Sequence, residues 1–347
     1  MQRRTEDLRI SRTRPMIPPA ILHEELPLTE PISEVIGSAR DQVVEILHGR
    51  DQRVLVVVGP CSIHDPEASI QYADQLTALA DEVKDKLLIV MRAYFEKPRT
   101  TVGWKGFIND PNLDESFEIN KGLRLARKLL LDINGLGMPT GSEFLDLQIP
   151  QHIADLTSWV AIGARTTESQ VHRELASGLS MPVGFKNTTE GTVQPAIDAV
   201  RSARSPHWFP SVTKEAVSAL FQTTGNLDCH VILRGGSRTG PNYDSESVGK
   251  AVERLEVEGL PARLMVDCSH GNSKKDYRKQ SEVLHDVEAQ IRGGSRSIMG
   301  VMIESNLVEG RQDVQPGVPL TFGQSITDSC ISFAETQSLL RGFANAI

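Results

Sequence analysis

The chain has 347 residues, of which 39% are hydrophobic and 24% are charged, and its formal net charge is −8. This length allows a large buried core, and an acidic chain without a basic stripe is not expected to have nucleic acid as its main partner. No run of about 18 apolar residues exists, so no membrane span is expected. The first nine residues are charged and do not read as a secretory signal, and the four scattered cysteines fit a reducing compartment. We therefore expect a soluble, cytoplasmic protein.

Residues 1–53 read as an N-terminal arm followed by a helix. Several prolines interrupt the first part, and only Ile32–Leu47 has the spacing of an amphipathic helix. An arm of this kind packs on its own domain or on a neighbouring subunit. We expect a homo-oligomer, either a dimer or a tetramer, in which the arm makes oligomeric or regulatory contacts.

From residue 54 to residue 347, short apolar segments alternate with amphipathic helical patterns. The first segment is continuous and rich in β-branched residues, which is typical of a strand buried on both faces of a parallel sheet. Asp65 and Pro66 then predict the start of a helix. Eight strand–helix repeats indicate a closed (β/α)8 TIM barrel, an α/β fold. The predicted strands are Val54–Gly59, Leu87–Arg92, Pro139–Phe144, Val160–Ala164, Val183–Lys186, His230–Arg234, Arg263–Ser269 and Ser297–Glu304.

Two connections are longer than a barrel needs. Ala93–Leu113 is dense in Gly, Pro, Lys and Arg, and we expect it to bind substrate. Residues 201–228 carry aromatic and hydroxyl side chains, and we expect an inserted β-hairpin outside the barrel with a regulatory or interfacial role. Long ordered loops are usually functional, which supports both expectations.

Six cationic side chains are expected near the carboxyl ends of the strands, where barrel enzymes place their active sites. Burying like charges is costly unless an anion neutralises them, and the planar fork of arginine suits phosphate and carboxylate. The pattern predicts a substrate site with more than one anionic group. Pairing with internal Asp and Glu side chains is the alternative. The six residues are Arg92, Lys97, Arg99, Arg165, Lys186 and Arg234.

A second set contains a thiol, an imidazole and two carboxylates: Cys61, His270, Glu304 and Asp328. These donors suit a divalent transition metal such as Mn, Fe, Co or Zn, provided that the barrel closes and brings them together. A metal facing a cationic bowl suggests polarisation of a carbonyl during carbon–carbon bond formation between phosphorylated metabolites. Two alternatives remain, a Schiff-base aldolase using Lys186 and a non-catalytic metabolite sensor.

Five motifs carry a family resemblance that covers almost the whole chain. The chain resembles class I 3-deoxy-D-arabino-heptulosonate 7-phosphate (DAHP) synthases of the bacterial type regulated by aromatic amino acids. The resemblance implies condensation of phosphoenolpyruvate with D-erythrose 4-phosphate and water, giving DAHP and phosphate in the first step of the shikimate pathway. The motifs are residues 59–62 (GPCS), 92–100 (RAYFEKPRT), 163–169 (GARTTES), 184–187 (GFKN) and 267–272 (DCSHGN).

The resemblance also assigns roles within the site. It implies Cys61, His270, Glu304 and Asp328 as metal ligands, and Lys97, Lys186, Cys61 and His270 as catalytic residues. It implies that phosphoenolpyruvate binds Arg92, Ala164, Arg165, Lys186 and Arg234, with Lys97 shared and Glu143 holding a water. The erythrose 4-phosphate contacts are then Lys97, Pro98, Arg99 and Thr100. In this assignment Lys186 is a charge clamp and not a Schiff-base nucleophile.

Regulated members of this family bind an aromatic amino acid beside the inserted hairpin. An apolar slot with a few hydroxyl groups suits phenylalanine, and Ser211 resembles the phenylalanine-sensitive type. Tyrosine and tryptophan are the alternative effectors. The matching positions are Leu147, Gln151, Leu175, Leu179, Ser180, Phe209, Ser211 and Phe221.

Two segments depart from the family pattern. Thr188 stands where a glycine is usual, which predicts a changed backbone after Lys186. The loop of residues 235–241 is longer than usual and lacks a lysine after its glycines. Neither segment contains a predicted metal ligand, so we expect activity to be retained.

Overall fold

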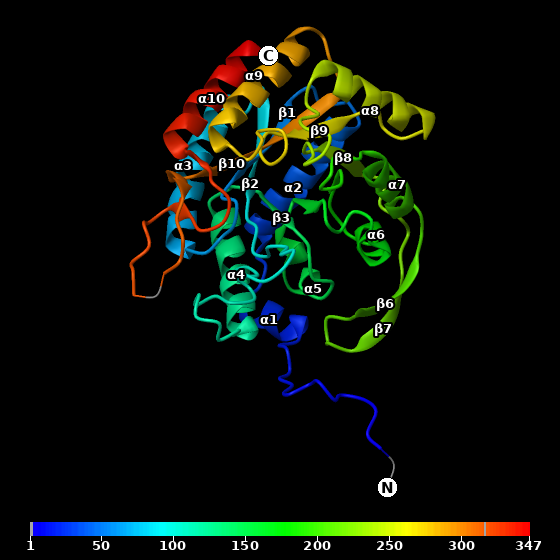
Figure 1. The fold of residues 1–347 in the computed structure, drawn as a ribbon, viewed down its shortest axis with the longest axis vertical. Helices are drawn as coiled ribbons and strands as arrows, with labels where there is room; N and C mark the ends of the chain where they lie inside the picture. The colour runs from blue at the N-terminus through cyan, green and yellow to red at the C-terminus, as the bar shows by residue number, and fades with distance from the viewer. Residues whose placement is uncertain (1–2, 316) are drawn as a thin grey trace.

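The computed structural model describes residues 3–315 and 317–347, and its centre is a closed barrel of parallel strands (Figure 1). The strand order is β1-β2-β3-β4-β5-β8-β9-β10, and β1 pairs with β10 to close the ring. The predicted TIM barrel is therefore confirmed. The strands are β1 (Val54–Gly59), β2 (Leu87–Arg92), β3 (Thr140–Glu143), β4 (Trp159–Ile162), β5 (Val183–Lys186), β8 (Cys229–Leu233), β9 (Leu264–Asp267) and β10 (Ile298–Asn306).

Alternate residues of each strand face two different cores, as the period of a strand requires. Leu55 and Val57 of β1 belong to the barrel interior, which also contains the fully buried Trp159. Val56 and Val58 belong to the larger layer between the strands and the surrounding helices. Because both faces are covered, the strands read as continuous apolar runs and not as alternating ones.

The helices that follow the strands form the outer layer. Asp65 caps α3 (Pro66–Val83), since its side chain accepts the N–H groups of Glu67 and Ala68 at 3.0 and 3.2 Å. None of the helices within residues 3–315 and 317–347 is long and apolar enough to cross a membrane. The other helices are α4 (Ile119–Gly135), α5 (Pro150–Ile153), α6 (Gln170–Ser177), α7 (Gln194–Ala203), α8 (Ser245–Val257), α9 (Gln280–Arg292) and α10 (Phe333–Ala346), with short 3-10 turns η1 (Ala154–Leu156) and η2 (Tyr277–Lys279).

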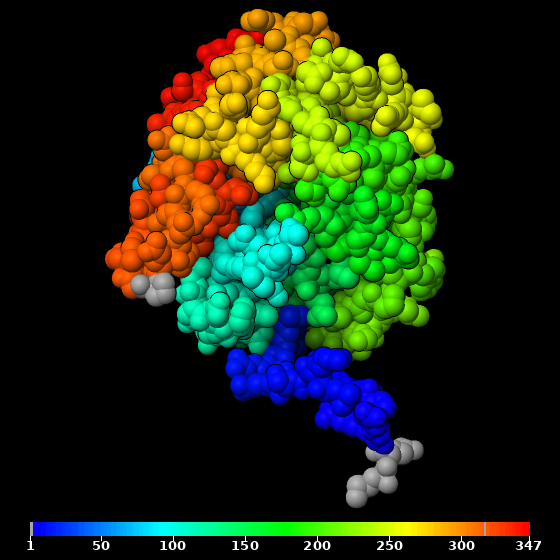
Figure 2. Space-filling model, viewed as in Figure 1, coloured from blue at the N-terminus to red at the C-terminus, as the bar shows by residue number. Residues whose placement is uncertain are grey.

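The N-terminal region closes one end of the barrel. Helix α2 (Glu30–Leu47) spans the predicted helix, and its residues Val43, Ile46 and Leu47 pack into the barrel interior. The chain before α1 (Pro19–Glu25) extends away from the body of the molecule (Figures 1 and 2). Helix α2 covers one end of the barrel, and the loops that follow the strands lie at the opposite end.

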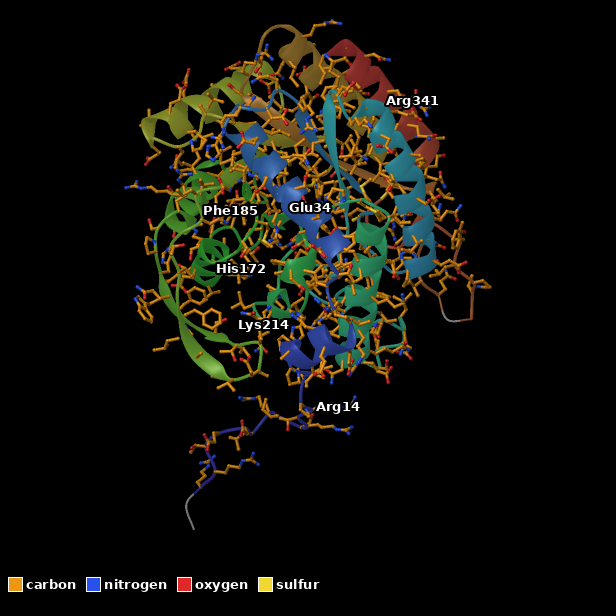
Figure 3. The ribbon with its side chains drawn as sticks, turned by 180° about the vertical axis from the view of Figure 1, so that it is seen from behind. Arg14, Glu34, His172, Phe185, Lys214 and Arg341 are labelled. Atoms are coloured by element: carbon orange, nitrogen blue, oxygen red, sulfur yellow. The ribbon has the colours of Figure 1, made fainter. Side chains whose placement is uncertain are left out.

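The predicted inserted hairpin is confirmed as β6 (Trp208–Val212) and β7 (Ser218–Gln222), an antiparallel pair outside the barrel. Phe209 and Phe221 are half-buried, whereas Trp208 lies on the exposed face. Figure 3 shows Lys214 at the end of the hairpin beside α1, where its carbonyl accepts the N–H of Ala20 at 2.7 Å. A second small pair, β11 (Val308–Arg311) with β12 (Gln324–Ser325), precedes β13 (Ile331–Ser332), which extends β10.

Candidate active site

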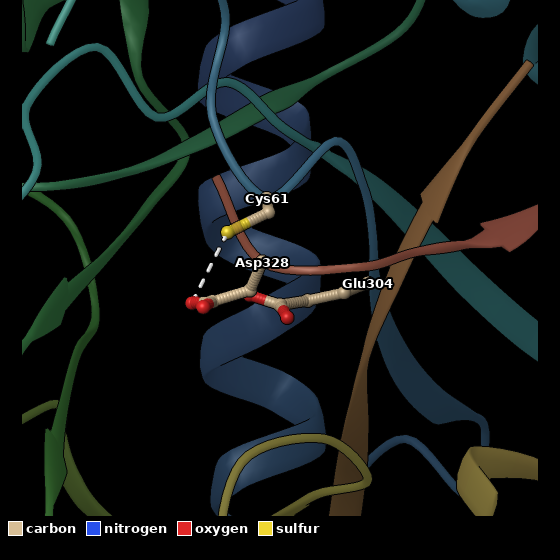
Figure 4. A group of neighbouring side chains, drawn as sticks. All are labelled: Cys61, Glu304 and Asp328. Atoms are coloured by element: carbon tan, nitrogen blue, oxygen red, sulfur yellow. Dashed lines mark hydrogen bonds between the residues drawn. The ribbon is translucent and has the colours of Figure 1, made fainter. Parts of the chain in front are cut away.

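Three of the four predicted metal ligands form one tight group at the carboxyl end of the barrel (Figure 4). Cys61 follows β1, Glu304 lies in β10, and Asp328 precedes β13. The parallel pairing of β1 with β10 sets Gly59 opposite Glu304, which brings the first two together. One ligand atom from each of the three lies within 4.8 Å of the others, and the Cys61 Sγ lies 3.6 Å from Asp328 Oδ2.

His270 lies beside this group. Its Nε2 is 3.8 Å from Glu304 Oε1, and its Nδ1 is 2.9 Å from Asp267 Oδ2. Its φ of 56° is in the left-handed region, which non-glycine residues adopt uncommonly and which is enriched at functional sites. Sulfur, nitrogen and oxygen donors in one place fit a divalent transition ion, so these four residues suit a metal by their chemistry.

Burial sets the state of the Cys61 thiol. It raises the pKa of Cys61 to about 11, and the carboxylate of Glu304 adds to this effect. Lys97 opposes it, with its Nζ 3.1 Å from the sulfur. A thiolate at this position therefore needs additional positive charge beside it, which a coordinated metal ion provides.

Two of the predicted cations are paired inside the protein. Arg92 is almost fully buried, donates to Glu304 Oε1 at 3.1 Å and stacks over the ring of Tyr94 at 3.9 Å. Lys186 donates to Asp267 Oδ2 at 2.9 Å. For these two residues the internal pairing that the sequence left open is present.

Arg165 and Arg234 have no such partner among the residues that the structure describes. Arg234 is 8% exposed, and its side chain donates only to the carbonyls of Thr189 and Gly235 at 3.4 and 3.3 Å. Arg165 donates to the hydroxyl of Thr100 at 3.3 Å. Burial lowers the pKa of Arg234, and nearby Arg165 lowers it further, although Asp267 opposes the change. Two guanidinium groups near each other without a carboxylate contact are suited to an anion.

The remaining predicted substrate residues border the same end of the barrel, which is hollowed near the centre of the view in Figure 2. Pro98 is half-buried, Arg99 and Thr100 are exposed, and the Nε of Arg99 donates to the carbonyl of Trp104 at 2.7 Å. Ala164 is half-buried after β4. Glu143 ends β3 and lies so close to Gly163 that a Cβ there would be 2.3 Å from its Oε1.

The backbone at position 188 does not require the glycine that the family pattern has there. The φ of Thr188 is not positive, and its hydroxyl accepts the N–H of Thr192 at 3.0 Å. An ordinary side chain therefore fits the segment after Lys186. The expected change of backbone is not required at this position.

Asp267 is a site residue that the sequence analysis did not assign. It is fully buried, and its Oδ2 contacts both Lys186 and His270, while its Oδ1 accepts the N–H of Ser269 at 3.0 Å. Although burial favours the neutral acid, Lys186 and then His270 hold the pKa of Asp267 well below its ordinary value. The sequence offered one signal for this residue: it is an acidic residue at the end of an apolar strand, and it begins the motif of residues 267–272.

The predicted effector residues line a second cavity of about 750 Å³, between the hairpin, α6 and the chain around α5. The rings of Phe209 and Phe221 are 6.2 Å apart and inclined at 49°. Asp155 and Lys214, which were not predicted, also line the cavity, and burial lowers the pKa of Lys214. The eight predicted residues on its wall are Leu147, Gln151, Leu175, Leu179, Ser180, Phe209, Ser211 and Phe221.

Comparison with known proteins gives consistent matches along the chain. The sequence profile of the DAHP synthetase I family matches residues 29–341. The Phe-sensitive phospho-2-dehydro-3-deoxyheptonate aldolase of Escherichia coli K12 is 57% identical over 347 residues, covering 100% of this chain and 99% of that relative. The Tyr-sensitive enzyme of the same organism is 53% identical, covering 96% of this chain and 94% of its own. A solved structure of phospho-2-dehydro-3-deoxyheptonate aldolase from Francisella tularensis superposes with a TM-score of 0.95 at 53% identity, covering 97% of this chain and 98% of that one. The chain therefore belongs to the DAHP synthetase I family.

Proposed function

We infer that the chain is a DAHP synthase, a transferase that condenses phosphoenolpyruvate with D-erythrose 4-phosphate and water and releases phosphate. The observation that carries this inference is the group Cys61, Glu304 and Asp328 beside the guanidinium groups of Arg165 and Arg234, which have no carboxylate partner among the described residues. A carbonyl-activating centre next to an anion site is what this reaction needs. Family membership supports the same assignment.

Four cations are assigned to phosphoenolpyruvate: Arg92, Arg165, Lys186 and Arg234. Arg92 and Lys186 are held by Glu304 and Asp267, so their positions are set before substrate arrives. Arg165 and Arg234 supply charge that no carboxylate of the described residues neutralises through an ion pair. Lys97, Pro98, Arg99 and Thr100 are assigned to erythrose 4-phosphate, because this basic segment, in which Arg99 and Thr100 are exposed, borders the same opening. Ala164 and Glu143 complete the assigned substrate site.

Cys61, His270, Glu304 and Asp328 are the residues assigned to hold a divalent metal ion, with Mn, Fe, Co or Zn as candidates. When bound, such an ion polarises a carbonyl oxygen. Asp267 holds the Nδ1 side of His270, which leaves Nε2 directed at Glu304 and available as a ligand. Equilibrium dialysis tests the site directly: wild type should bind one equivalent, and Cys61→Ser should bind the same metals more weakly by a factor of about 10 to 100.

The chemical test is release of phosphate from phosphoenolpyruvate. We expect release only when erythrose 4-phosphate is also present, loss of release after chelation, and recovery on adding metal back. No release under any of these conditions would leave a non-catalytic sensor as the better explanation.

A Schiff-base aldolase makes a different prediction. Lys186 is held in a buried ion pair with Asp267 at 2.9 Å, whereas a Schiff-base nucleophile must be free to attack the carbonyl carbon of the substrate. Borohydride with a keto substrate should therefore leave Lys186 unmodified. A covalent adduct at Lys186, together with activity that survives chelation, would contradict the metal-dependent assignment.

The cavity beneath the hairpin is assigned to a feedback inhibitor, with phenylalanine favoured. Its wall combines the aromatic rings of Phe209 and Phe221 with the hydroxyl of Ser211, and Lys214 and Asp155 offer charges for an amino acid's carboxylate and ammonium groups. Assays with each aromatic amino acid should show the strongest inhibition by phenylalanine. Tyrosine and tryptophan are the alternatives.

A homodimer or homotetramer is proposed from the projecting arm. The arm exposes Leu8 and Ile10, which are 64% and 57% exposed, on a segment that extends from the body. A second copy of the chain would cover such apolar side chains. Light scattering of the full chain and of a chain lacking residues 1–16 tests this proposal, since only the full chain should form the complete oligomer.

A further inference from the structure

Glu96 is a buried carboxylate next to a predicted catalytic residue, and it has no positively charged partner within residues 3–315 and 317–347. It precedes Lys97 in the connection between β2 and α4 and is 3% exposed. None of the cations among the described residues forms an ion pair with it. Its oxygens instead accept two backbone N–H groups, that of Asp146 at 3.0 Å and that of Leu145 at 3.3 Å. A buried charge of this kind is costly and therefore calls for an explanation.

The two amides belong to the segment that leads into the cavity beneath the hairpin. The side chain of Asp146 accepts the N–H groups of Gln148 and Ile149 at 2.7 and 3.3 Å, which fixes the turn after β3. Leu147, within this turn, and Gln151, just beyond it, line the cavity. A ligand in the cavity would therefore contact residues of this turn.

Helix α6 is hydrogen-bonded to the peptide of Leu145, whose N–H also bonds to Glu96. Its residue His172 lies 2.8 Å from the carbonyl of Leu145 through Nε2, and the helix also contributes Leu175 to the cavity wall (Figure 3). The peptide of Leu145 is thus bonded to α6 on one side and to Glu96 on the other. These bonds connect the cavity wall to Glu96.

On its other side, Glu96 is joined covalently to Lys97. The Nζ of Lys97 lies 3.1 Å from the sulfur of Cys61 and 3.2 Å from its carbonyl oxygen. Adjacent side chains on a non-helical backbone point to different sides, so one residue faces the cavity segment while the next faces the metal group. Moving one of the two displaces the other.

We propose that Glu96 is a positioning residue that couples the cavity beneath the hairpin to Lys97 in the active site. This inference rests on the proposed function and adds the physical connection between its two sites. Glu96 is not one of the residues assigned to substrate or metal. Its role is to transmit the position of residues 145–151 to the lysine that follows it.

Protonation of Glu96 provides an independent readout. Burial, together with the acidic side chains of Asp146 and Glu143, raises the pKa of Glu96 to about 8, although the amides of Leu145 and Asp146 oppose the rise. The ionised carboxylate accepts at both oxygens, whereas the neutral acid has one oxygen that carries a proton and accepts less well. The coupling should therefore strengthen as the pH increases through about 8.

The test compares wild type with Glu96→Gln and a matched control, Asp110→Asn. Asp110 is also buried in the β2–α4 connection and accepts a backbone amide, that of Glu115 at 3.2 Å, but it bonds within its own loop. Calorimetry measures L-phenylalanine binding with and without phosphoenolpyruvate, and the ratio of the two dissociation constants is the coupling factor. Phosphate release measures the KM for erythrose 4-phosphate and the inhibition by phenylalanine.

Above the Glu96 pKa of about 8, where its carboxylate is ionised, we expect a coupling factor of about 10 in wild type and in Asp110→Asn, falling to within about twofold of 1 in Glu96→Gln. Phenylalanine should still bind Glu96→Gln in the absence of phosphoenolpyruvate, because the cavity wall is unchanged. The KM for erythrose 4-phosphate should rise in Glu96→Gln. A merely structural role would alter stability and leave the coupling factor as it is in wild type.

Glu96→Asp is the second variant, since it keeps the charge but is too short to reach both amides. If Glu96→Gln does not fold, loss of coupling in Glu96→Asp or its increase with pH in wild type supports the proposal. An active, inhibited wild type whose coupling neither changes with pH nor differs from that of the Glu96 variants overturns this inference and leaves the proposed function intact. A wild type that never releases phosphate would instead overturn the proposed function, and this inference with it.

Discussion

Replacement of Asp267 by asparagine should destabilise the protein as well as inactivate it. Asp267 is fully buried and bonds to Lys186 at 2.9 Å, while its other oxygen accepts the N–H of Ser269. Asparagine can keep the Ser269 bond but turns an N–H₂ donor or a neutral carbonyl toward the ammonium. Lys186 is then a buried charge without a counter-charge. Removing one partner of a buried pair costs about 3–5 kcal/mol, and we expect that loss in the free energy of unfolding.

A double-mutant cycle separates this cause from general damage to the fold. Lys186→Met combined with Asp267→Asn removes the charge as well as its partner. The free energy of unfolding of the double variant should therefore be higher, by about 2 kcal/mol or more, than the value expected from adding the losses of the two single variants. Urea unfolding measures the four stabilities, and phosphate release should stay absent in every variant that lacks Lys186. Additive losses, or an Asp267→Asn protein within about 1 kcal/mol of wild type, would refute the reasoning.

Three further outcomes follow from single positions. Gly184→Ala should cost about 1–3 kcal/mol in urea unfolding, because its Cβ would lie 2.5 Å from Ile232 and 2.8 Å from Trp159 inside the barrel. Wild type should lose stability relative to Glu96→Gln as the pH rises from 4.5 to about 8, because the carboxyl group ionises at a lower pH in the unfolded chain than in the folded one. The free energy of unfolding of wild type should fall by about 5 kcal/mol relative to that of Glu96→Gln over this range, and parallel curves of stability against pH would contradict the prediction. Phe209→Ala should raise the phenylalanine concentration for half-inhibition about tenfold or more while leaving the uninhibited rate unchanged, and a lower uninhibited rate would argue against a separate effector cavity.

The barrel itself was predictable because its evidence is local. Most of the strands are short apolar runs with a polar residue at or soon after their end, and the runs recur at the spacing of a strand–helix repeat. Val54–Gly59 was predicted at the bounds that the structure has, and Asp65 was predicted as the cap of the following helix. Continuous apolar strands that alternate with amphipathic helices are compatible with few folds other than a parallel sheet or barrel. The short helix α1 was not predicted, because it spans seven residues among prolines.

The composition of the candidate site was also readable from strand ends and motifs. Cys61, Glu304 and Asp328 were chosen by donor chemistry, and ring closure between β1 and β10 explains why residues so far apart in the chain meet. The side-chain partners were not readable in this way. Arg92 and Lys186 looked equivalent to Arg165 and Arg234, yet within the part of the chain that the structure describes only the first two have carboxylate partners.

The sequence by itself determined which segments form strands and which chemical groups stand at their ends, because periodicity and residue type are properties of neighbouring positions. Only the tertiary structure decided which charges neutralise one another, since each pairing joins separate strands. The contact of Asp267 with Lys186 forms only in the folded chain, and so does the contact of Glu96 with the amide of Asp146. These contacts depend on barrel closure and on the path of one loop, which no local pattern encodes.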